Sequence, residues 1–351
     1  MFPREYRGVA FVVGLFVVVQ LGALALVPEF AESGYQAVEN PDNPTNSLLY
    51  IAAIVVMTAL MLAAFRYNFD QAIRLLIVGV SAWLSWYVFS ALVSPLAAAV
   101  PAVAVGVALL VYPEWYVIDT AGVLMGAGAA GLFGISFGLL PALILLAFLA
   151  VYDAISVYGT EHMLSLAEGV MDLNIPVVLV IPLSLSYTLL GGDEDAGETE
   201  QAAESETTGS EPVESGTAES GTAGSEPIES EAAESETTEE PGVSEPTDIE
   251  DRDAFFIGLG DAVIPAVLVA SAARFSPADA LSVPFFVVNL PAVLAMVGSL
   301  AGLVVLMSWV IKGRPHAGLP LLNGGAIGGY LLGSVLAGVS LVEALGIGAF
   351  L

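Results

Sequence analysis

Two aspartates stand in otherwise apolar stretches of this chain, and they are its strongest candidates for chemistry. Asp153 follows Ala-Val-Tyr, and Asp261 follows Ile-Gly-Leu-Gly. An ionisable group inside a membrane span costs about 2.5 kcal/mol or more and is a functional candidate by default. Two carboxylates in a low-dielectric site do not both ionise easily, so a pair shares one proton. Such a pair can activate water with one member and protonate a carbonyl oxygen with the other.

The titratable residues also allow interpretations that involve no catalysis. Asp153 and Asp261 could instead be separate structural acids or cation ligands. Asp119 and Glu343 are expected to be solvated helix ends, because each falls near the end of an apolar stretch. His162 and His316 have no second ligand at a suitable spacing for zinc. The sequence has no cysteine and no serine-hydrolase, zinc-protease or phosphate-loop motif, and we expect no metal or organic cofactor.

Nine apolar stretches would position the two aspartates. The chain is 56% hydrophobic with a mean hydropathy of +0.82, and a transmembrane helix needs about 20 mostly apolar residues. We therefore predict an all-α polytopic membrane protein, without a cleavable signal peptide, whose sixth and seventh spans carry the aspartates. The predicted spans are 8–28, 47–65, 72–93, 96–112, 116–135, 138–158, 257–275, 283–311 and 320–342.

Basic residues predict how the chain crosses the membrane. With nine spans and the N-terminus inside, seven of the eight Lys and Arg residues fall on the cytoplasmic side, and only Arg274 lies outside. This orientation places the C-terminus outside. It also brings Asp153 and Asp261 to a similar depth near the cytoplasmic face, where they could meet.

Acidic residues are concentrated between the sixth and seventh spans. Of the 37 acidic residues, 20 lie between Gly191 and Glu250, a stretch without Lys or Arg. Its Glu, Ser, Thr, Ala, Gly and Pro residues predict a disordered cytoplasmic linker. The net charge of −29 argues against nucleic acid as a partner and suggests a high-salt organism.

The stretch before this linker is harder to interpret. Residues 160–173 predict an amphipathic interfacial helix. Over 174–190, Pro176, Pro182 and several β-branched residues favour an extended segment at the membrane edge. A tenth span is the alternative, but it would disturb the charge pattern. The predicted organisation is therefore helices one to six in 1–158, the interfacial and extended segments in 159–190, the linker in 191–250, and helices seven to nine in 251–351.

A third motif begins the last predicted span. It reads Gly-Leu-Pro-Leu-Leu-Asn-Gly-Gly from Gly318. Pro320 lacks an N–H and leaves irregular backbone, which membranes tolerate only beside protein or water. This backbone could therefore line a site, although an ordinary helix N-terminal proline is the alternative. Gly258 and Gly260 are expected to allow close backbone approach beside Asp261.

These motifs, in this order across nine spans, resemble the presenilin and signal peptide peptidase family of intramembrane aspartyl proteases, in a microbial and haloarchaeal form. The resemblance rests on Tyr152-Asp153, on Gly258-Leu259-Gly260-Asp261 and on the Pro-x-Leu at Pro320. The position of the loop between the aspartates also fits. So do His162-Met163-Leu164 and Ile175-Pro176-Val177, as does Pro113-Glu114-Trp115, which lies closer to the first aspartate in presenilins.

The resemblance implies an endopeptidase that uses Asp153 and Asp261 with water. Pro320, Leu321 and Leu322 would correspond to the family's Pro-Ala-Leu motif, which shapes the site and contacts substrate, although Leu321 replaces the usual alanine. Residues 176–181 and 253–257 would correspond to segments that pair with an extended substrate strand. Implied partners are transmembrane peptides and the bilayer of the plasma membrane, with a homo-oligomer possible and no obligatory partner subunit. A transporter or channel that uses the same carboxylates is the alternative, but no internal repeat supports it.

Overall fold

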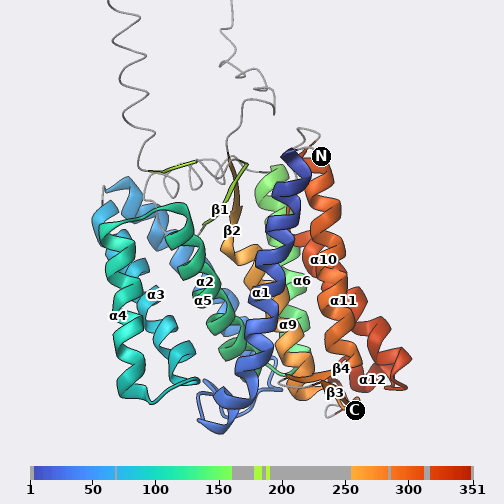
Figure 1. Cartoon of the computed structure of the whole chain (residues 1–351). Helices are drawn as coiled ribbons and strands as arrows, with labels where there is room; N and C mark the ends of the chain where they lie inside the picture. Colours follow the sequence, from blue (N-terminus) through green and yellow to red (C-terminus); the bar gives the residue numbers. More distant parts are fainter. Residues whose placement is uncertain are drawn as a thin grey trace, which may run out of the picture. The chain divides into compact units, whose positions relative to one another are not determined.

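Long apolar helices make up most of the chain that the computed structural model describes (Figure 1). The described residues are 4–67, 69–159, 178–183, 187–189, 254–283, 286–311 and 317–348. They belong to one unit formed from both sides of the central insertion. The predicted interfacial helix over 160–173, the linker over 191–250, His162 and His316 lie outside the described residues.

Each predicted span corresponds to one helix in the described part of the chain. By length and composition, seven of these helices could cross a membrane. The other two, α4 and α9, have 17 residues each, which is the lower limit for a span. The helices are α1 (Arg4–Glu32), α2 (Thr45–Arg66), α3 (Asp70–Ser90), α4 (Pro95–Val111), α5 (Trp115–Ser136), α6 (Leu139–Gly159), α9 (Leu259–Phe275), α10 (Leu290–Val310) and α11 (Leu319–Leu336).

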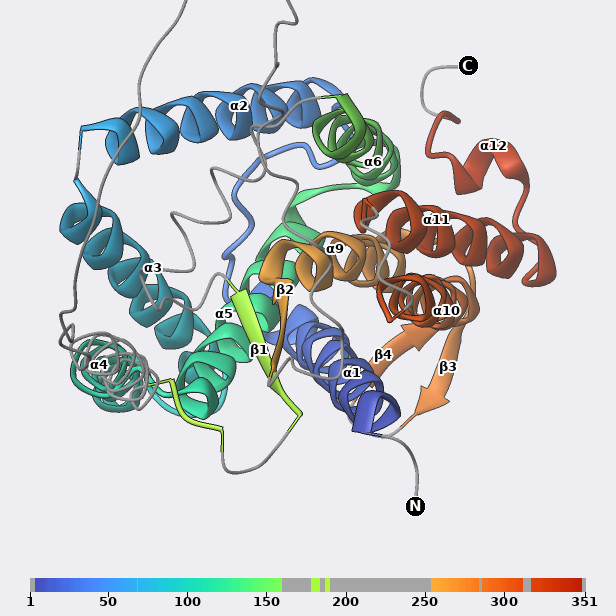
Figure 2. The ribbon, with the colours of Figure 1, turned by 90° about the horizontal axis from the view of Figure 1, so that it is seen from above.

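Helices α5 and α9 form the centre of the bundle (Figure 2). Most of α9 is buried, as expected for a helix that is apolar on all sides. Gly134 of α5 lies against Ala270 of α9, so small residues allow the two helices to approach closely. Helices α1, α6, α10 and α11 also contact α9. Asp261 is therefore carried by the helix with the most complete protein surroundings.

Helices α10 and α11 pack with their backbones in contact. A Cβ added to Gly325 of α11 would overlap the carbonyl oxygen of Gly298 on α10, and one on Gly302 would overlap that of Leu321. Small residues at such interfaces let membrane helices gain van der Waals contact along their length. This packing determines where the N-terminus of α11 lies.

Two strands next to the central insertion pair with each other. Strand β1 (Val178–Pro182) runs antiparallel to β2 (Ala254–Gly258), with Val178 opposite Gly258 and Pro182 opposite Ala254. Residues 178–182 lie in the stretch where β-branched residues favour an extended chain. Strand β2 continues directly into α9, so the sheet ends three residues before Asp261.

The predicted limits of the eighth and ninth spans are wrong. The eighth helix begins at Leu290, because β3 (Ala280–Val283) and β4 (Phe286–Asn289) form a hairpin before it. Asn289 ends β4 and caps α10 by accepting a hydrogen bond from the Ala292 N–H at 3.0 Å. The ninth helix ends at Leu336, shortly before Gly338, whose φ is +78°, and the four-residue α12 (Leu341–Ala344) follows.

Candidate active site

Asp153 lies in the last third of α6 and faces the beginning of α11. Its side chain is only 8% exposed. Its Oδ2 accepts a hydrogen bond from the Leu319 N–H at 3.0 Å, and the Gly318 N–H also donates to this carboxylate. The first N–H groups of a helix have no partner within the helix, and they favour a nearby negative charge. The start of α11 therefore holds Asp153 in place.

Asp261 lies in the first turn of α9, directly after β2. A carboxylate in this position is favoured by the positive end of the helix dipole. Its side chain is partly exposed, in contrast to Asp153. Asp261 can therefore meet solvent or substrate while its helix remains buried.

The two aspartates meet at Gly318. A Cβ on Gly318 would lie 3.1 Å from Oδ2 of Asp261, while the Gly318–Leu319 backbone donates to Asp153. The two carboxyl groups are also near enough for their charges to interact. Three elements distant in sequence, α6, α9 and the start of α11, thus converge on one point. Both carboxyl groups therefore lie beside the same short stretch of backbone at the start of α11.

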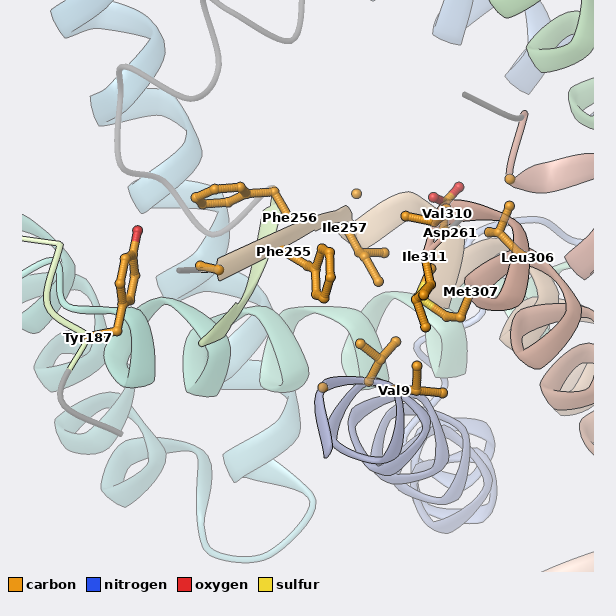
Figure 3. Close-up of a pocket in the computed structure, with 15 residues that line it drawn as sticks. Val9, Tyr187, Phe255, Phe256, Ile257, Asp261, Leu306, Met307, Val310 and Ile311 are labelled. Atoms are coloured by element: carbon orange, nitrogen blue, oxygen red, sulfur yellow. The ribbon is translucent and has the colours of Figure 1, made fainter. Parts of the chain in front are cut away.

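A cavity of about 560 Å³ opens beside Asp261 (Figure 3). Tyr187 lies at the far end of this cavity from Asp261, with Phe255 and Phe256 between them. A volume of this size holds water as well as part of a peptide. Its lining is otherwise mostly apolar and comes from α1, β2, α10 and Gly318: Gly8, Val9, Val12, Ala254, Ile257, Gly258, Leu306, Met307, Val310 and Ile311.

The expected reason for glycine at two positions next to Asp261 is wrong. A Cβ on Gly258 would come no closer than 3.8 Å to Asp261, and one on Gly260 would meet no atom within 4 Å. Neither glycine is therefore required by contacts with the part of the chain that the structure describes. Gly258 lines the cavity, where the absence of a side chain leaves the β2 backbone accessible. The glycine that is crowded against Asp261 is Gly318.

The remaining motif residues separate into different surroundings. Pro320 lines a second groove of about 560 Å³ between α6 and α11. Leu322 is fully buried in the core, and the carbonyl oxygen of Leu321 lies against Gly302. Tyr152 is 39% exposed and stacks on Phe148 of its own helix, at 6.3 Å between ring centroids. Leu259 is buried at the start of α9.

Sequence reasoning missed several residues at this site. Val9 and Val12 of α1 line the cavity, although nothing in their apolar span distinguishes them from lipid-facing valines. Gly318 was visible as part of the Pro320 motif, but its contact with Asp261 depends on how α11 packs on α10. Asp119 is 4% exposed, so the expected solvated helix end is wrong. Glu343 does fit a helix-end role, because it forms a capping box with Ser340 in α12.

Comparisons with known proteins find a matching family model and similar solved structures. A family model described as "Signal-peptide peptidase, presenilin aspartyl protease" matches residues 13–339. No curated protein sequence matches the chain significantly. Two solved structures of a presenilin family intramembrane aspartate protease are similar to it. The one in space group C222 is 29% identical, with a TM-score of 0.58, and the match covers 93% of this chain and 99% of that one. The one in space group P2 is 30% identical, with a TM-score of 0.55, and the match covers 92% and 96%.

Proposed function

Because this chain belongs to the signal-peptide peptidase and presenilin family of aspartyl proteases, we propose that Asp153 and Asp261 are its catalytic pair. Membership makes the chain a multi-pass intramembrane aspartyl protease that acts on peptides. The observation that carries the proposal is the convergence of both carboxyl groups on Gly318 beside a cavity. The transport alternative has no comparable support.

The chemistry follows from one proton held between two carboxyl groups. The ionised member takes a proton from water, and the water oxygen attacks the carbonyl carbon of the scissile peptide bond. The protonated member gives its proton to the carbonyl oxygen at the same time. The tetrahedral intermediate then collapses as a proton passes to the amide nitrogen, and the C–N bond breaks. The donors at Gly318 and Leu319 keep Asp153 oriented during these steps.

An extended substrate fits the edge of β2. The cavity runs along Ala254 to Gly258 and reaches Asp261, so a peptide lying there would have its backbone beside both. Addition of a strand to a sheet edge supplies main-chain hydrogen bonds and exposes a peptide bond that a helix would conceal. The substrates we propose are therefore transmembrane segments or signal peptides that unwind locally. Pro320 would contact substrate from the groove beside α6, while buried Leu322 positions α11.

The proposed orientation places the N-terminus and the acidic linker in the cytoplasm and the C-terminus outside the plasma membrane. The Lys and Arg residues on one side of the predicted spans support this orientation, and aromatic residues at both ends of the bundle mark the two membrane interfaces, which Trp and Tyr favour. Trp83 and Trp86 gather with Tyr87 near the end of α3. Trp115 and Tyr116 gather at the start of α5. The proposed protein works without an obligatory partner subunit and can form homo-oligomers.

Cleavage of a reporter transmembrane peptide by purified protein in liposomes tests this function. Wild-type protein is expected to cleave the peptide, whereas the Asp153→Ala and Asp261→Ala variants are not. Mass spectrometry of the products would locate the cleaved bond within the transmembrane segment. Equal cleavage by wild-type protein and either variant would refute the proposed pair.

The rate of cleavage is expected to follow a bell-shaped dependence on pH. The pair needs one charged and one neutral carboxyl group, so activity falls when both are protonated and when both are ionised. Initial rates with a reporter peptide that has no titratable side chain would measure this dependence. A flat profile between about pH 4 and pH 9 would contradict a shared-proton pair.

Deletion of residues 195–248 is expected to change the cleavage rate by no more than roughly threefold, because loop length alters closure entropy only slowly. We propose that the linker tethers residues 1–158 to residues 251–351 without contributing to the site. Cleavage assays on the deletion variant at low and high salt would test this. A loss beyond tenfold at both salt concentrations would show that the linker has a role in catalysis.

A further inference from the structure

Two buried acids on α5 have no part in the chemistry derived above. Glu114 is the N-cap of α5, and Asp119 lies one turn into the helix. Each side chain is only 4% exposed. Asp119 Oδ1 accepts a hydrogen bond from the Val180 N–H at 2.8 Å. Glu114 accepts from the Thr188 hydroxyl and from the Leu189 N–H. Both acids therefore hold the chain segment that contains β1.

The hydrogen bond from the Val180 N–H to Asp119 determines which edge of the β1–β2 sheet can accept a further strand. Val180 is the middle residue of β1 and lies opposite Phe256. In an antiparallel ladder, opposite residues alternate between pairs that exchange hydrogen bonds and pairs whose N–H and C=O groups face outward. The N–H of Val180 is bonded to Asp119, so Val180 and Phe256 form an outward-facing pair. Asp119 therefore closes the outer edge of β1, and Phe256 presents its backbone at the outer edge of β2.

The same alternation extends to the end of β2 nearest Asp261. Gly258 lies opposite Val178, two positions along the ladder from the Val180 pair, so its backbone also faces the outer edge of β2. Phe256 and Gly258 both line the cavity. Among the described residues, the edge of the sheet that remains open is thus the one that faces the cavity.

The helix that carries the two acids is well suited to act as a support. Helix α5 packs along both α9 and α1, and most of its inner face is buried. Because α5 contacts both β1 and α9, it fixes the position of β1 relative to Asp261. Strand β1 is held from two points, with Asp119 at its middle and Glu114 beyond its end. Leu179, Val180 and Ile181 are themselves buried.

We propose that Asp119 and Glu114 are positioning residues that anchor β1 to α5 and so hold the open edge of β2 in register with the catalytic pair. This inference rests on the proposed function and deepens it. The ligand that the edge takes is an extended, apolar peptide strand. Asp119 acts on the reaction only through β1 and β2, and it excludes a substrate strand from the edge of β1.

The Asp119→Ala variant tests the anchor. Its KM for a transmembrane reporter peptide is expected to rise roughly ten- to hundredfold, the equivalent of one hydrogen bond to a charged group. Cleavage is also expected to spread to neighbouring peptide bonds, which mass spectrometry of the products would detect. A loss of general stability alone would lower the amount of active protein and leave KM and the cleaved bond unchanged.

Two further variants make the test specific. Asp119→Asn keeps an oxygen that accepts from Val180 and is expected to restore the wild-type KM and cleavage site. Thr188→Val removes one donor to Glu114 from an exposed position. It is expected to raise KM and spread the cleavage site as Asp119→Ala does, but to a smaller extent. Asp279→Asn, in an exposed loop, serves as the matched control with wild-type behaviour.

Two results would overturn the anchor. One is a wild-type KM and cleavage site in both Asp119→Ala and Thr188→Val. If Asp119→Ala did not fold, wild-type behaviour of Thr188→Val alone would overturn the anchor. The other is an Asp119→Asn protein as defective as Asp119→Ala. Failure of the proposed function is distinguishable, because it requires cleavage to persist in Asp153→Ala or Asp261→Ala.

Discussion

The Asp153→Asn and Asp261→Asn proteins are expected to fold normally and to lose cleavage of a transmembrane peptide by roughly 10³-fold or more, since one acid–base group typically contributes about 10²- to 10⁴-fold. Asparagine has the size of aspartate but cannot carry the exchanged proton. At residue 153 it can still accept the Leu319 N–H, so the junction of α6 with α11 should persist. The loss should therefore be in kcat and not in folding.

The comparison needs a control and a measure of folding. Asp279→Asn makes the same chemical change at an exposed position outside the bundle core, and it should cleave like the wild type. Thermal unfolding in detergent should give similar midpoints for all four proteins. Cleavage by Asp261→Asn at the wild-type rate would mean that the convergence on Gly318 has no catalytic purpose.

The Gly325→Ala protein is expected to be destabilised by about 2–3 kcal/mol and to lose most of its activity. The added methyl group would overlap the Gly298 carbonyl oxygen, which is backbone and cannot rotate away. Overpacking of this kind costs about 1–3 kcal/mol or more, because the helices must separate. Separation of α10 from α11 would also move Gly318 and Leu319 relative to both aspartates, so activity should fall further than stability alone predicts.

Gly328→Ala is the matched control for this substitution. It lies on the same helix, and a methyl group there would meet nothing within 4 Å. Alanine is a better helix former than glycine, so Gly328→Ala should be neutral or slightly stabilising, by about 0.5–1 kcal/mol. Thermal unfolding and peptide cleavage measured side by side would check both variants. Equal midpoints for the two proteins would refute a backbone contact between α10 and α11.

Much of the fold could be predicted because the membrane imposes a local rule. A span must be long and apolar, so each of the nine predicted spans matches one helix of the described residues. The predicted limits were wrong where apolar length and hydropathy did not correspond to a helix. The apolar stretch before Leu290 satisfies the hydropathy of a helix, yet it forms the β3–β4 hairpin. Burial of Asp119 was also missed, because proximity to a span end says nothing about the strand that covers it.

Residue types and order by themselves determined that this is a polytopic membrane protein of the aspartyl protease family, and that Asp153 and Asp261 are its candidate pair. A charge in an apolar span is costly wherever the helix lies, so its importance can be recognised from the sequence alone. Only the tertiary structure decided that the pair meets at Gly318, that β1 pairs with β2, and that Asp119 closes one edge of that sheet. These contacts join helices and strands distant in sequence, and they depend on backbone packing that no local pattern encodes.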